Sequence, residues 1–109
     1  MSRHGRAGVA LLACLGVSVG ACARRSPRAH VVRMSNFTFV PAALDVAAGD
    51  TLVFTNADMV PHTTTATDGA WDSKSIEAGA TWRVVARTPG RHAYDCTFHP
   101  TMKGTVTVR

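Results

Sequence analysis

Apolar and polar residues alternate along short segments of the chain from residue 31 to the C-terminus, which is the pattern of half-buried β-strands. Leu52 and Phe54 share one face of such a segment, and Val106 and Val108 share one face of the last. The expected strand regions are residues 31–41, 44–46, 51–55, 61–67, 82–86, 92–96 and 106–108. Turn pairs separate them, including Gly49-Asp50, Asp68-Gly69 and Pro89-Gly90. Because no segment has a clear 3.6-residue apolar period, the pattern predicts an all-β sandwich or barrel.

The first residues follow a different pattern, that of an export signal. Arg3 and Arg6 precede an uncharged run at residues 7–19, which ends in small residues. A membrane-spanning helix needs about 20 apolar residues, so this run is too short to form one. A basic start, a short apolar run and small residues after it are typical of a secretory signal peptide. A cytoplasmic protein with an unrelated apolar N-terminus is the alternative.

Two cleavage sites fit the end of this segment. Val19-Gly20-Ala21-Cys22 resembles a bacterial lipobox, in which the cysteine is lipidated and becomes the first mature residue. Ala21-Cys22-Ala23 instead fits the A-x-A site of ordinary secretion, with release after Ala23. We favour the lipobox because Cys22 lies where that motif needs a cysteine. The expected organisation is a signal peptide at residues 1–21, a tether at residues 22–30 and one folded domain at residues 31–109.

Charge and composition argue against nucleic-acid binding. The chain has 109 residues, of which 46% are hydrophobic, and a formal net charge of +5. Part of that charge belongs to the signal, and part to the tether, where Arg24, Arg25 and Arg28 can contact anionic lipid headgroups. No stripe of basic residues interleaved with aromatic residues follows residue 30, so we expect no nucleic-acid partner.

The cysteines indicate a metal. Cys14 is removed with the signal and Cys22 is the lipidation residue, so the folded domain keeps Cys96 alone. Exported proteins normally use cysteines in disulfide pairs, and an unpaired thiol in an oxidising compartment is exposed to side reactions. A metal ion that binds the thiolate removes this liability.

Four side chains form a candidate metal site. Cys96, His99 and Met102 are spaced as C-x2-H-x2-M on a short segment between two expected strands. His62 follows Pro61 and lies 34 residues before Cys96. One thiolate, two imidazoles and a weak axial thioether are the ligand set of a blue-copper electron-transfer site. Soft sulfur suits Cu(I) and imidazole suits Cu(II), so this mixture serves both oxidation states with little rearrangement.

Other chemistries fit these residues less well. A zinc site could use Cys96, His62 and His99, but a thioether is a poor Zn²⁺ ligand and the usual paired cysteines are missing. A Cys-His hydrolase would need an orienting group and oxyanion donors, and the sequence offers no recognisable set. Taken singly, each of the four residues could also be a core or turn residue, but their joint spacing favours a copper site.

At this point the sequence resembles a known family. Residues 31–109 are similar to the cupredoxins, specifically the plastocyanin/amicyanin group. The strongest match is the C-terminal stretch YDCTFHPTMKGTVTV, whose two residues between histidine and methionine are the amicyanin spacing. The other matching segments are F-x-F-x-P at Phe37–Pro41, the stretch Val46–Phe54 and the stretch Asn56–His62.

The resemblance implies a Greek-key β-sandwich with one type 1 copper ion near one end. It implies that His62, Cys96 and His99 are the equatorial ligands and that Met102 is the axial ligand. Asn56 matches a family asparagine whose hydrogen bonds tie the two ligand loops together. His92 departs from the family pattern, because the strand entering the cysteine usually carries Tyr or Phe there. The lipobox-like leader is also unlike that of a freely diffusing periplasmic carrier.

These observations predict a single-electron carrier outside the bacterial cytoplasm, in the periplasm or cell envelope, attached to a membrane through lipidated Cys22. We do not expect an enzyme, because a catalytic copper would need further histidine ligands that His30 and His92 cannot plausibly supply. A periplasmic copper-binding or delivery protein is the alternative, although such sites tend to be exposed and rich in Met and His. A structural β-domain without metal is the third hypothesis.

Partner contact is expected around His99. This histidine lies on the short loop, where its ring edge can reach solvent, whereas we expect His62 to be more buried. An apolar patch of Met59, Val60 and Pro100 is expected beside it. A small apolar surface suits transient redox partners, which must dissociate quickly, and we expect the chain to be a monomer.

Overall fold

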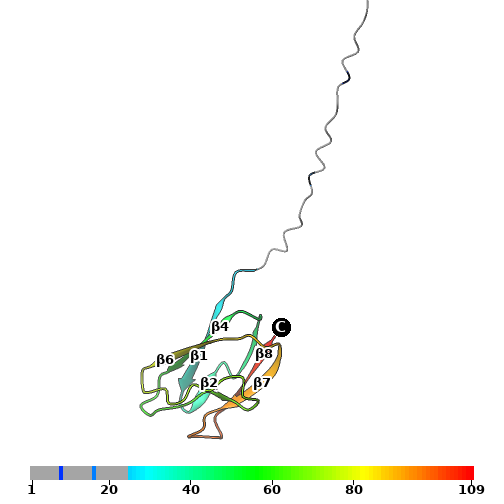
Figure 1. The fold of residues 1–109 in the computed structure, drawn as a ribbon. Coiled ribbons are helices and arrows are strands. Elements are labelled where there is room, and N and C mark those ends of the chain that lie inside the picture. The colour runs from blue at the N-terminus through cyan, green and yellow to red at the C-terminus, as the bar shows by residue number, and fades with distance from the viewer. Residues whose placement is uncertain (1–7, 9–15, 17–24) are drawn as a thin grey trace, which may run out of the picture.

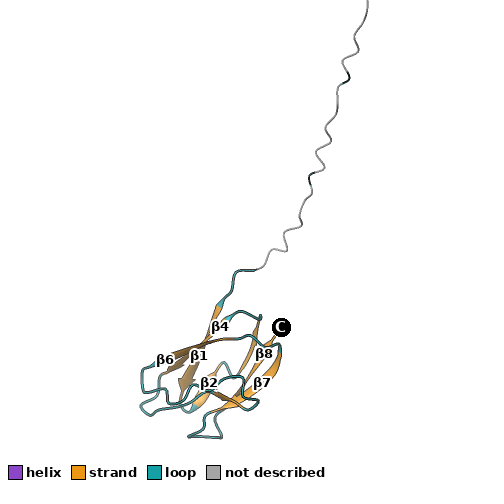
Figure 2. Ribbon diagram, viewed as in Figure 1, coloured by secondary structure: helices purple, strands orange, loops and turns teal. Residues whose placement is uncertain are grey.

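The computed structural model describes residues 8, 16 and 25–109, and residues 29–108 form a β-sandwich (Figure 1). Its strands are β1 (Ala29–Ser35), β2 (Thr38–Val40), β3 (Ala43–Val46), β4 (Thr51–Asn56), β5 (Thr65–Ala66), β6 (Thr81–Val85), β7 (Gly90–Asp95) and β8 (Lys103–Val108). Strands and loops account for all the described residues (Figure 2). Among them, no helix is long and apolar enough to cross a membrane. The all-β prediction is confirmed.

Two four-stranded sheets make up the sandwich. One has the order β2-β1-β4-β6 and the other β3-β8-β7-β5. Both sheets are mixed, because β1 runs parallel to β4 and β3 runs parallel to β8, while the other pairs are antiparallel. Strands that neighbour each other in a sheet are mostly distant in sequence, so the chain crosses repeatedly from one sheet to the other.

The core lies between the sheets and follows the alternation seen in the sequence. Leu52 and Phe54 are fully buried, as expected. Tyr94 of β7 packs edge-on against Phe39 and Phe54 of the opposite sheet, with ring centroids 4.7 and 5.6 Å apart. Burying each large apolar side chain contributes roughly 1.5–3 kcal/mol. The buried cluster also includes Val32, Met34, Val46, Trp71, Ile76, Cys96, Met102, Val106 and Val108.

The run expected at residues 31–41 is a hairpin and not one strand. The chain reverses at Asn36 and Phe37, which have φ angles of 53° and 58°, and Ser35 pairs with Thr38 on the two sides of the turn. Two consecutive positive φ angles are typical of the type I′ turn, for which Asn-Gly is the usual sequence. Because Phe stands at the glycine position, the pattern did not indicate a turn.

The threonine-rich segment at residues 61–67 is mostly loop. Only Thr65 and Ala66 form a strand there, and His62 makes an isolated bridge to Ile76. The buried Thr64 hydroxyl accepts a hydrogen bond from the indole N–H of Trp71 at 2.9 Å. The threonines in this loop therefore serve side-chain hydrogen bonding as well as β-structure.

Hydrogen bonds to Asp50 hold residues 25–28, which precede β1, against the domain. This buried carboxylate accepts hydrogen bonds from the Arg25 guanidinium at 3.0 Å, the Arg28 N–H at 3.0 Å and His30 Nε2 at 2.8 Å. The Arg28 amide and His30 lower the pKa of Asp50 far below its usual value. Strand β1 begins at Ala29, so residues 29 and 30 belong to the sheet and not to a free tether. Apart from residues 8 and 16, the expected signal peptide lies outside the described residues, and so does Cys22.

Candidate metal centre

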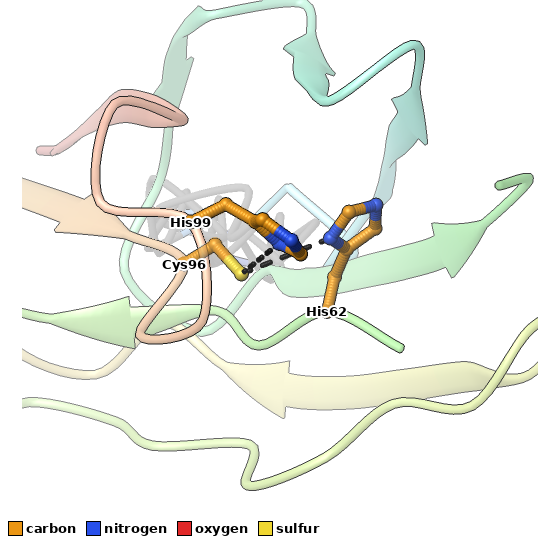
Figure 3. Close-up of side chains that lie close together, drawn as sticks. All are labelled: His62, Cys96 and His99. Atoms are coloured by element: carbon orange, nitrogen blue, oxygen red, sulfur yellow. Dashed lines mark hydrogen bonds between the residues drawn. The ribbon is translucent and has the colours of Figure 1, made fainter. Parts of the chain in front are cut away.

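The structure brings His62, Cys96 and His99 together at one end of the sandwich. Their potential ligand atoms all lie within 4.8 Å of one another. Cys96 follows β7, His99 lies in the β7–β8 loop, and His62 comes from the long segment between β4 and β5. Figure 3 shows both imidazoles turned toward the sulfur, which is 3.8 Å from His62 Nδ1 and 3.7 Å from His99 Nδ1. Residues 34 positions apart in sequence are thus neighbours in the fold.

Backbone hydrogen bonds close the C-x2-H-x2-M segment into a ring. The His99 N–H donates to the Cys96 carbonyl at 3.1 Å, and the Met102 N–H donates to the His99 carbonyl at 2.9 Å. The Cys96 N–H then donates to the Met102 carbonyl at 3.1 Å. A spacing of three residues is what each of the first two turns needs. The loop therefore fixes three of the four expected ligand residues relative to one another.

Burial differs among the four residues as the sequence predicted for the histidines. His62 and Cys96 have no exposed surface and Met102 is buried, whereas His99 is partly exposed. Solvent or a partner protein can therefore reach the site through His99 but not through His62. The expectation that His62 is the more buried histidine is confirmed.

Thr63 connects the two ligand segments. Its backbone N–H points at the Cys96 sulfur at 3.3 Å, and its hydroxyl oxygen accepts the Thr97 N–H at 2.8 Å. This contact fixes the position of the sulfur relative to the segment that carries His62. The residue next to His62 thus holds both Cys96 and the residue after it.

The role expected for Asn56 is corrected by these contacts. Its side-chain amide donates to the carbonyls of Val60 and Ile76 at 2.8 and 3.0 Å, and its side-chain oxygen accepts the Asp58 N–H at 2.9 Å. Among the described residues, these side-chain hydrogen bonds all stay on the His62 side of the site. Asn56 therefore shapes the loop that carries His62, and Thr63 makes the connection to the Cys96 loop.

Asp58 lies behind His62. Its carboxylate is 2.8 Å from His62 Nε2 and also accepts the backbone N–H groups of Asn36 at 2.8 Å and Phe37 at 2.9 Å. Burial opposes ionisation of Asp58, but the hydrogen bonds from Phe37 and His62 outweigh it and lower the pKa of the carboxyl group. A proton on Nε2 leaves the Nδ1 lone pair free, facing Cys96. Carboxylates behind ligand histidines commonly fix the ring in this way.

The donor set fits a soft, small metal ion. A thiolate and an imidazole that share an ion at bond lengths of about 2.3 and 2.1 Å, with an angle of about 110–120°, lie roughly 3.6–3.8 Å apart. The two sulfur–nitrogen distances of 3.8 and 3.7 Å match this range. One thiolate and two imidazoles beside a buried methionine form the donor set that suits copper.

Comparison with known proteins decides the family. The Cupredoxin-like domain family matches residues 8–108, nearly the whole chain. The chain belongs to the cupredoxin family. Amicyanin-alpha of Methylorubrum extorquens (strain AM1) is 30% identical to this cupredoxin over 82 residues, which cover 71% of this chain and 69% of that protein. The family and the fold expected from the C-terminal motif are therefore confirmed.

Solved structures agree. The Cu(I) form of an amicyanin variant superposes with a TM-score of 0.70 at 25% identity, covering 80% of this chain and 88% of that one. A purple cupredoxin from Nitrosopumilus maritimus superposes with a TM-score of 0.66 at 27% identity, covering 72% of this chain and 98% of that one. This cupredoxin is thus of the amicyanin type in both sequence and fold.

Three residues that touch the site of this cupredoxin were not predicted from the sequence. Phe37 contacts both imidazoles, with ring centroids 5.3 Å from His62 and 4.9 Å from His99. Thr63 and Asp58 make the hydrogen bonds described above. Thr63 is adjacent to His62 in sequence, and the Asp58–His62 spacing of four residues was available as a clue. Phe37 was named only as part of the family motif at Phe37–Pro41, and its contact with the site was not predicted because the turn that carries it was not recognised.

Proposed function

We propose that this cupredoxin binds one copper ion as a type 1 centre and carries single electrons between redox partner proteins. His62, Cys96 and His99 would be the equatorial ligands and Met102 the axial ligand. The observation that carries the proposal is the three-residue cluster, whose donor atoms lie within 4.8 Å of one another in a chain of the amicyanin type. When bound, copper supplies the one-electron couple.

The residues around the site suit electron transfer because they resist rearrangement. The ring of backbone hydrogen bonds among Cys96, His99 and Met102 holds these residues in place. The Thr63 N–H supports the thiolate, and Asp58 holds the His62 ring. A site that keeps one arrangement in both oxidation states keeps the barrier to electron transfer low. Burial of His62, Cys96 and Met102 also opposes the ready release that a copper-delivery protein needs.

The other described histidines support a carrier and not an enzyme in its own right. His30 is hydrogen-bonded to Asp50 at 2.8 Å. His92 is bonded to Asp68 through one ring nitrogen and to the Thr88 carbonyl through the other. Within residues 25–109, no histidine is therefore left to build a second, catalytic copper centre.

The partner is proposed to dock at the exposed edge of His99. Met59 is 92% exposed, and Phe37, Phe98 and Pro100 are exposed around the loops that carry the ligands. Val60, which the sequence placed in the same patch, is half-buried. Exposed apolar side chains grouped at one end commonly mark a protein-binding surface. A patch of this kind suits a transient encounter better than a permanent complex.

We also propose that the carrier works outside the bacterial cytoplasm, in the periplasm or cell envelope, anchored through lipidated Cys22. The support is the leader sequence alone, which ends in Val19-Gly20-Ala21-Cys22. Arg25 is hydrogen-bonded to Asp50 just before β1 begins, and Phe37, just beyond the other end of β1, contacts both ligand histidines. Figure 1 shows the N-terminal segment entering at one end of the sandwich and the β7–β8 loop at the opposite end. An anchor before Arg25 would leave the copper end facing away from the membrane.

The proposal is tested by adding Cu(II) to the purified, metal-free protein. We expect one copper per chain and intense blue, green or purple absorption from the thiolate. Cys96→Ser should abolish the colour, whereas Met102→Leu should keep the copper and shift the reduction potential. Met59→Leu, an exposed methionine outside the loop, is the matched control and should change neither. A colourless copper complex of the unaltered protein would contradict the electron-carrier function.

Membrane attachment has its own test. Full-length protein expressed in a bacterium should partition with membranes and carry a diacylglycerol group on Cys22. Cys22→Ser should abolish this modification. An unmodified N-terminus at Arg24, found by mass spectrometry, would show instead a soluble exported carrier.

A further inference from the structure

Phe37 forms a three-ring cluster with the two histidines of the site. Its ring centroid lies 4.9 Å from that of His99 and 5.3 Å from that of His62, and both pairs are close to perpendicular, at 84° and 81°. The His62 and His99 rings are themselves 5.2 Å apart. Phe37 remains 49% exposed, so one part of the ring faces the histidines and another faces solvent. It is therefore the outer wall of the site.

The backbone that carries Phe37 is strained. Asn36 and Phe37 form the two-residue turn between β1 and β2 and have φ angles of 53° and 58°. Asn tolerates this left-handed conformation, but a bulky residue adopts it rarely, and glycine is the usual choice at the second position. Strain of this kind persists only where the surroundings compensate it, and it is concentrated at functional sites.

The compensation comes from Asp58, which also holds His62. The carboxylate accepts the N–H groups of Asn36 at 2.8 Å and Phe37 at 2.9 Å, and its Oδ2 lies 2.8 Å from His62 Nε2. Hydrogen bonds to an ionised acceptor are stronger than those between neutral groups. One side chain thus fixes both the turn that presents the phenyl ring and the imidazole that the ring contacts.

We propose that Phe37 is a positioning residue of the metal centre, whose ring fixes the two imidazoles and shields their outer face from water. The proposal rests on the proposed function for the metal, but the ring contacts do not depend on it. A residue needed only to fill space would have no reason to occupy a strained turn with half its surface exposed. A residue that must reach both ligand rings from the β1–β2 turn has that reason.

Phe37→Gly separates this role from folding. Glycine suits the left-handed turn, so the variant should fold and resist urea at least as well as the unaltered chain. In the copper-loaded protein, loss of the ring admits water to the imidazoles. Because water stabilises the more highly charged oxidised centre, the reduction potential should fall. Copper should also pass to a chelator several-fold faster, and the electron paramagnetic resonance spectrum should change.

The metal-free protein provides a readout that is independent of copper. Nuclear Overhauser contacts should join the Phe37 ring protons to imidazole protons of both His62 and His99. Phe37→Gly should shift those imidazole resonances, because the ring current of the phenyl group is lost. Phe37→Tyr keeps an aromatic ring, so its imidazole resonances and its reduction potential should match those of the unaltered protein. Val40→Ala, which trims another exposed apolar side chain on β2, is the matched control and should alter none of these signals.

The outcomes separate the two proposals. A folded Phe37→Gly protein with unchanged imidazole resonances and an unchanged potential would overturn the role of Phe37 and leave the carrier function intact. A colourless copper complex of the unaltered protein would remove the carrier function, while the contacts in the metal-free protein would still decide whether Phe37 positions the histidines. If glycine prevents folding, Phe37→Asn, which also suits the turn, provides the same comparison.

Discussion

The buried imidazole of His92 lies with its Nδ1 2.5 Å from the carboxylate of Asp68. Its other ring nitrogen, Nε2, is 2.7 Å from the Thr88 carbonyl, which can only accept a hydrogen bond. Both nitrogens therefore face acceptors, and the charged imidazolium satisfies both. The Thr88 carbonyl, together with Asp68, raises the pKa of His92 although burial opposes it. A charged pair thus occupies the position where the family pattern led us to expect an aromatic residue.

The first prediction is that this pair makes stability depend on pH. Since the pKa of His92 is higher in the folded protein than the usual value of 6.5, its stabilisation is complete below pH 6.5. It is lost as pH rises through the raised pKa. His92→Phe should therefore lose less free energy of unfolding between mildly acidic and alkaline pH than the unaltered protein does, in urea titrations of the metal-free forms.

Asp68→Asn is the matched control for His92, because it removes the charge of the partner and keeps the imidazole. It should flatten the same pH dependence. If the free energy of unfolding changes equally with pH in the unaltered protein and in His92→Phe, the His92–Asp68 pair contributes nothing to the pH dependence of stability.

The second prediction concerns the connection between the ligand loops. Thr63→Val has nearly the same shape but lacks the hydroxyl that accepts the Thr97 N–H. The same hydroxyl is also hydrogen-bonded to the Thr65 hydroxyl at 3.0 Å and to the Thr97 hydroxyl at 3.2 Å. We expect the free energy of unfolding to fall by about 1–3 kcal/mol, because each hydrogen bond contributes about 1 kcal/mol. The absorption of the copper complex should also shift, because the Thr63 N–H beside the Cys96 sulfur is no longer held in place. Thr63→Ser keeps the hydroxyl and should behave like the unaltered protein in both measurements.

Residues of the fold and of the site could be predicted from the sequence where the deciding contacts are between residues close together in the chain. Cys96, His99 and Met102 are three residues apart, and that spacing matches the turns that close the loop. The alternation at Leu52 and Phe54 identified a strand because each side chain must face either core or solvent. His62 was found because a cysteine site needs imidazoles and because the segment before it resembles the family.

The sequence was insufficient where a contact depends on the path of the backbone. The Phe37 turn was missed because its two positive φ angles are compensated by Asp58, more than 20 residues away. Thr63 was missed because a hydrogen bond from a backbone N–H to sulfur leaves no trace in residue type. Asn56 was assigned a role between the two ligand loops by resemblance, but its side chain bonds to Asp58 and Val60 of its own loop and to the Ile76 carbonyl.

The third prediction is that Asp50 protects the N-terminal segment from proteolysis. Asp50→Ala removes the acceptor for Arg25, the Arg28 N–H and His30, so the segment before β1 should open more often. Trypsin should then cleave after Arg25 or Arg28 faster than in the unaltered protein. Because the pKa of Asp50 is far below 3.8, this protection should persist in mild acid and fail only in strong acid. Asp45→Ala, an exposed carboxylate on β3, should leave the cleavage rate unchanged.

The last relationship is steric, between two residues that face each other across β7 and β8. Gly104 pairs with Tyr94, and a Cβ atom added at Gly104 would lie 2.3 Å from both Cζ and the hydroxyl oxygen of Tyr94. The ring of Tyr94 is fully buried, so it has no room to move away. Within the described residues its hydroxyl group has no hydrogen-bond partner, and burial raises its pKa. The glycine therefore makes space for the tyrosine that leads into Cys96.

We expect Gly104→Ala to lower the free energy of unfolding by about 1–3 kcal/mol, since an overpacked core must shift to relieve the contact. When Tyr94→Leu is combined with Gly104→Ala, the loss of unfolding free energy caused by the alanine should be smaller. A double-mutant cycle, followed by urea unfolding, measures this interaction energy between positions 94 and 104. Tyr94→Phe keeps the ring and loses the unpartnered hydroxyl group, so its free energy of unfolding should fall little or even rise. Because Cζ stays in place, Tyr94→Phe should relieve only part of the steric overlap that Gly104→Ala creates. If the two substitutions are additive, the tyrosine ring is not what excludes a side chain at position 104.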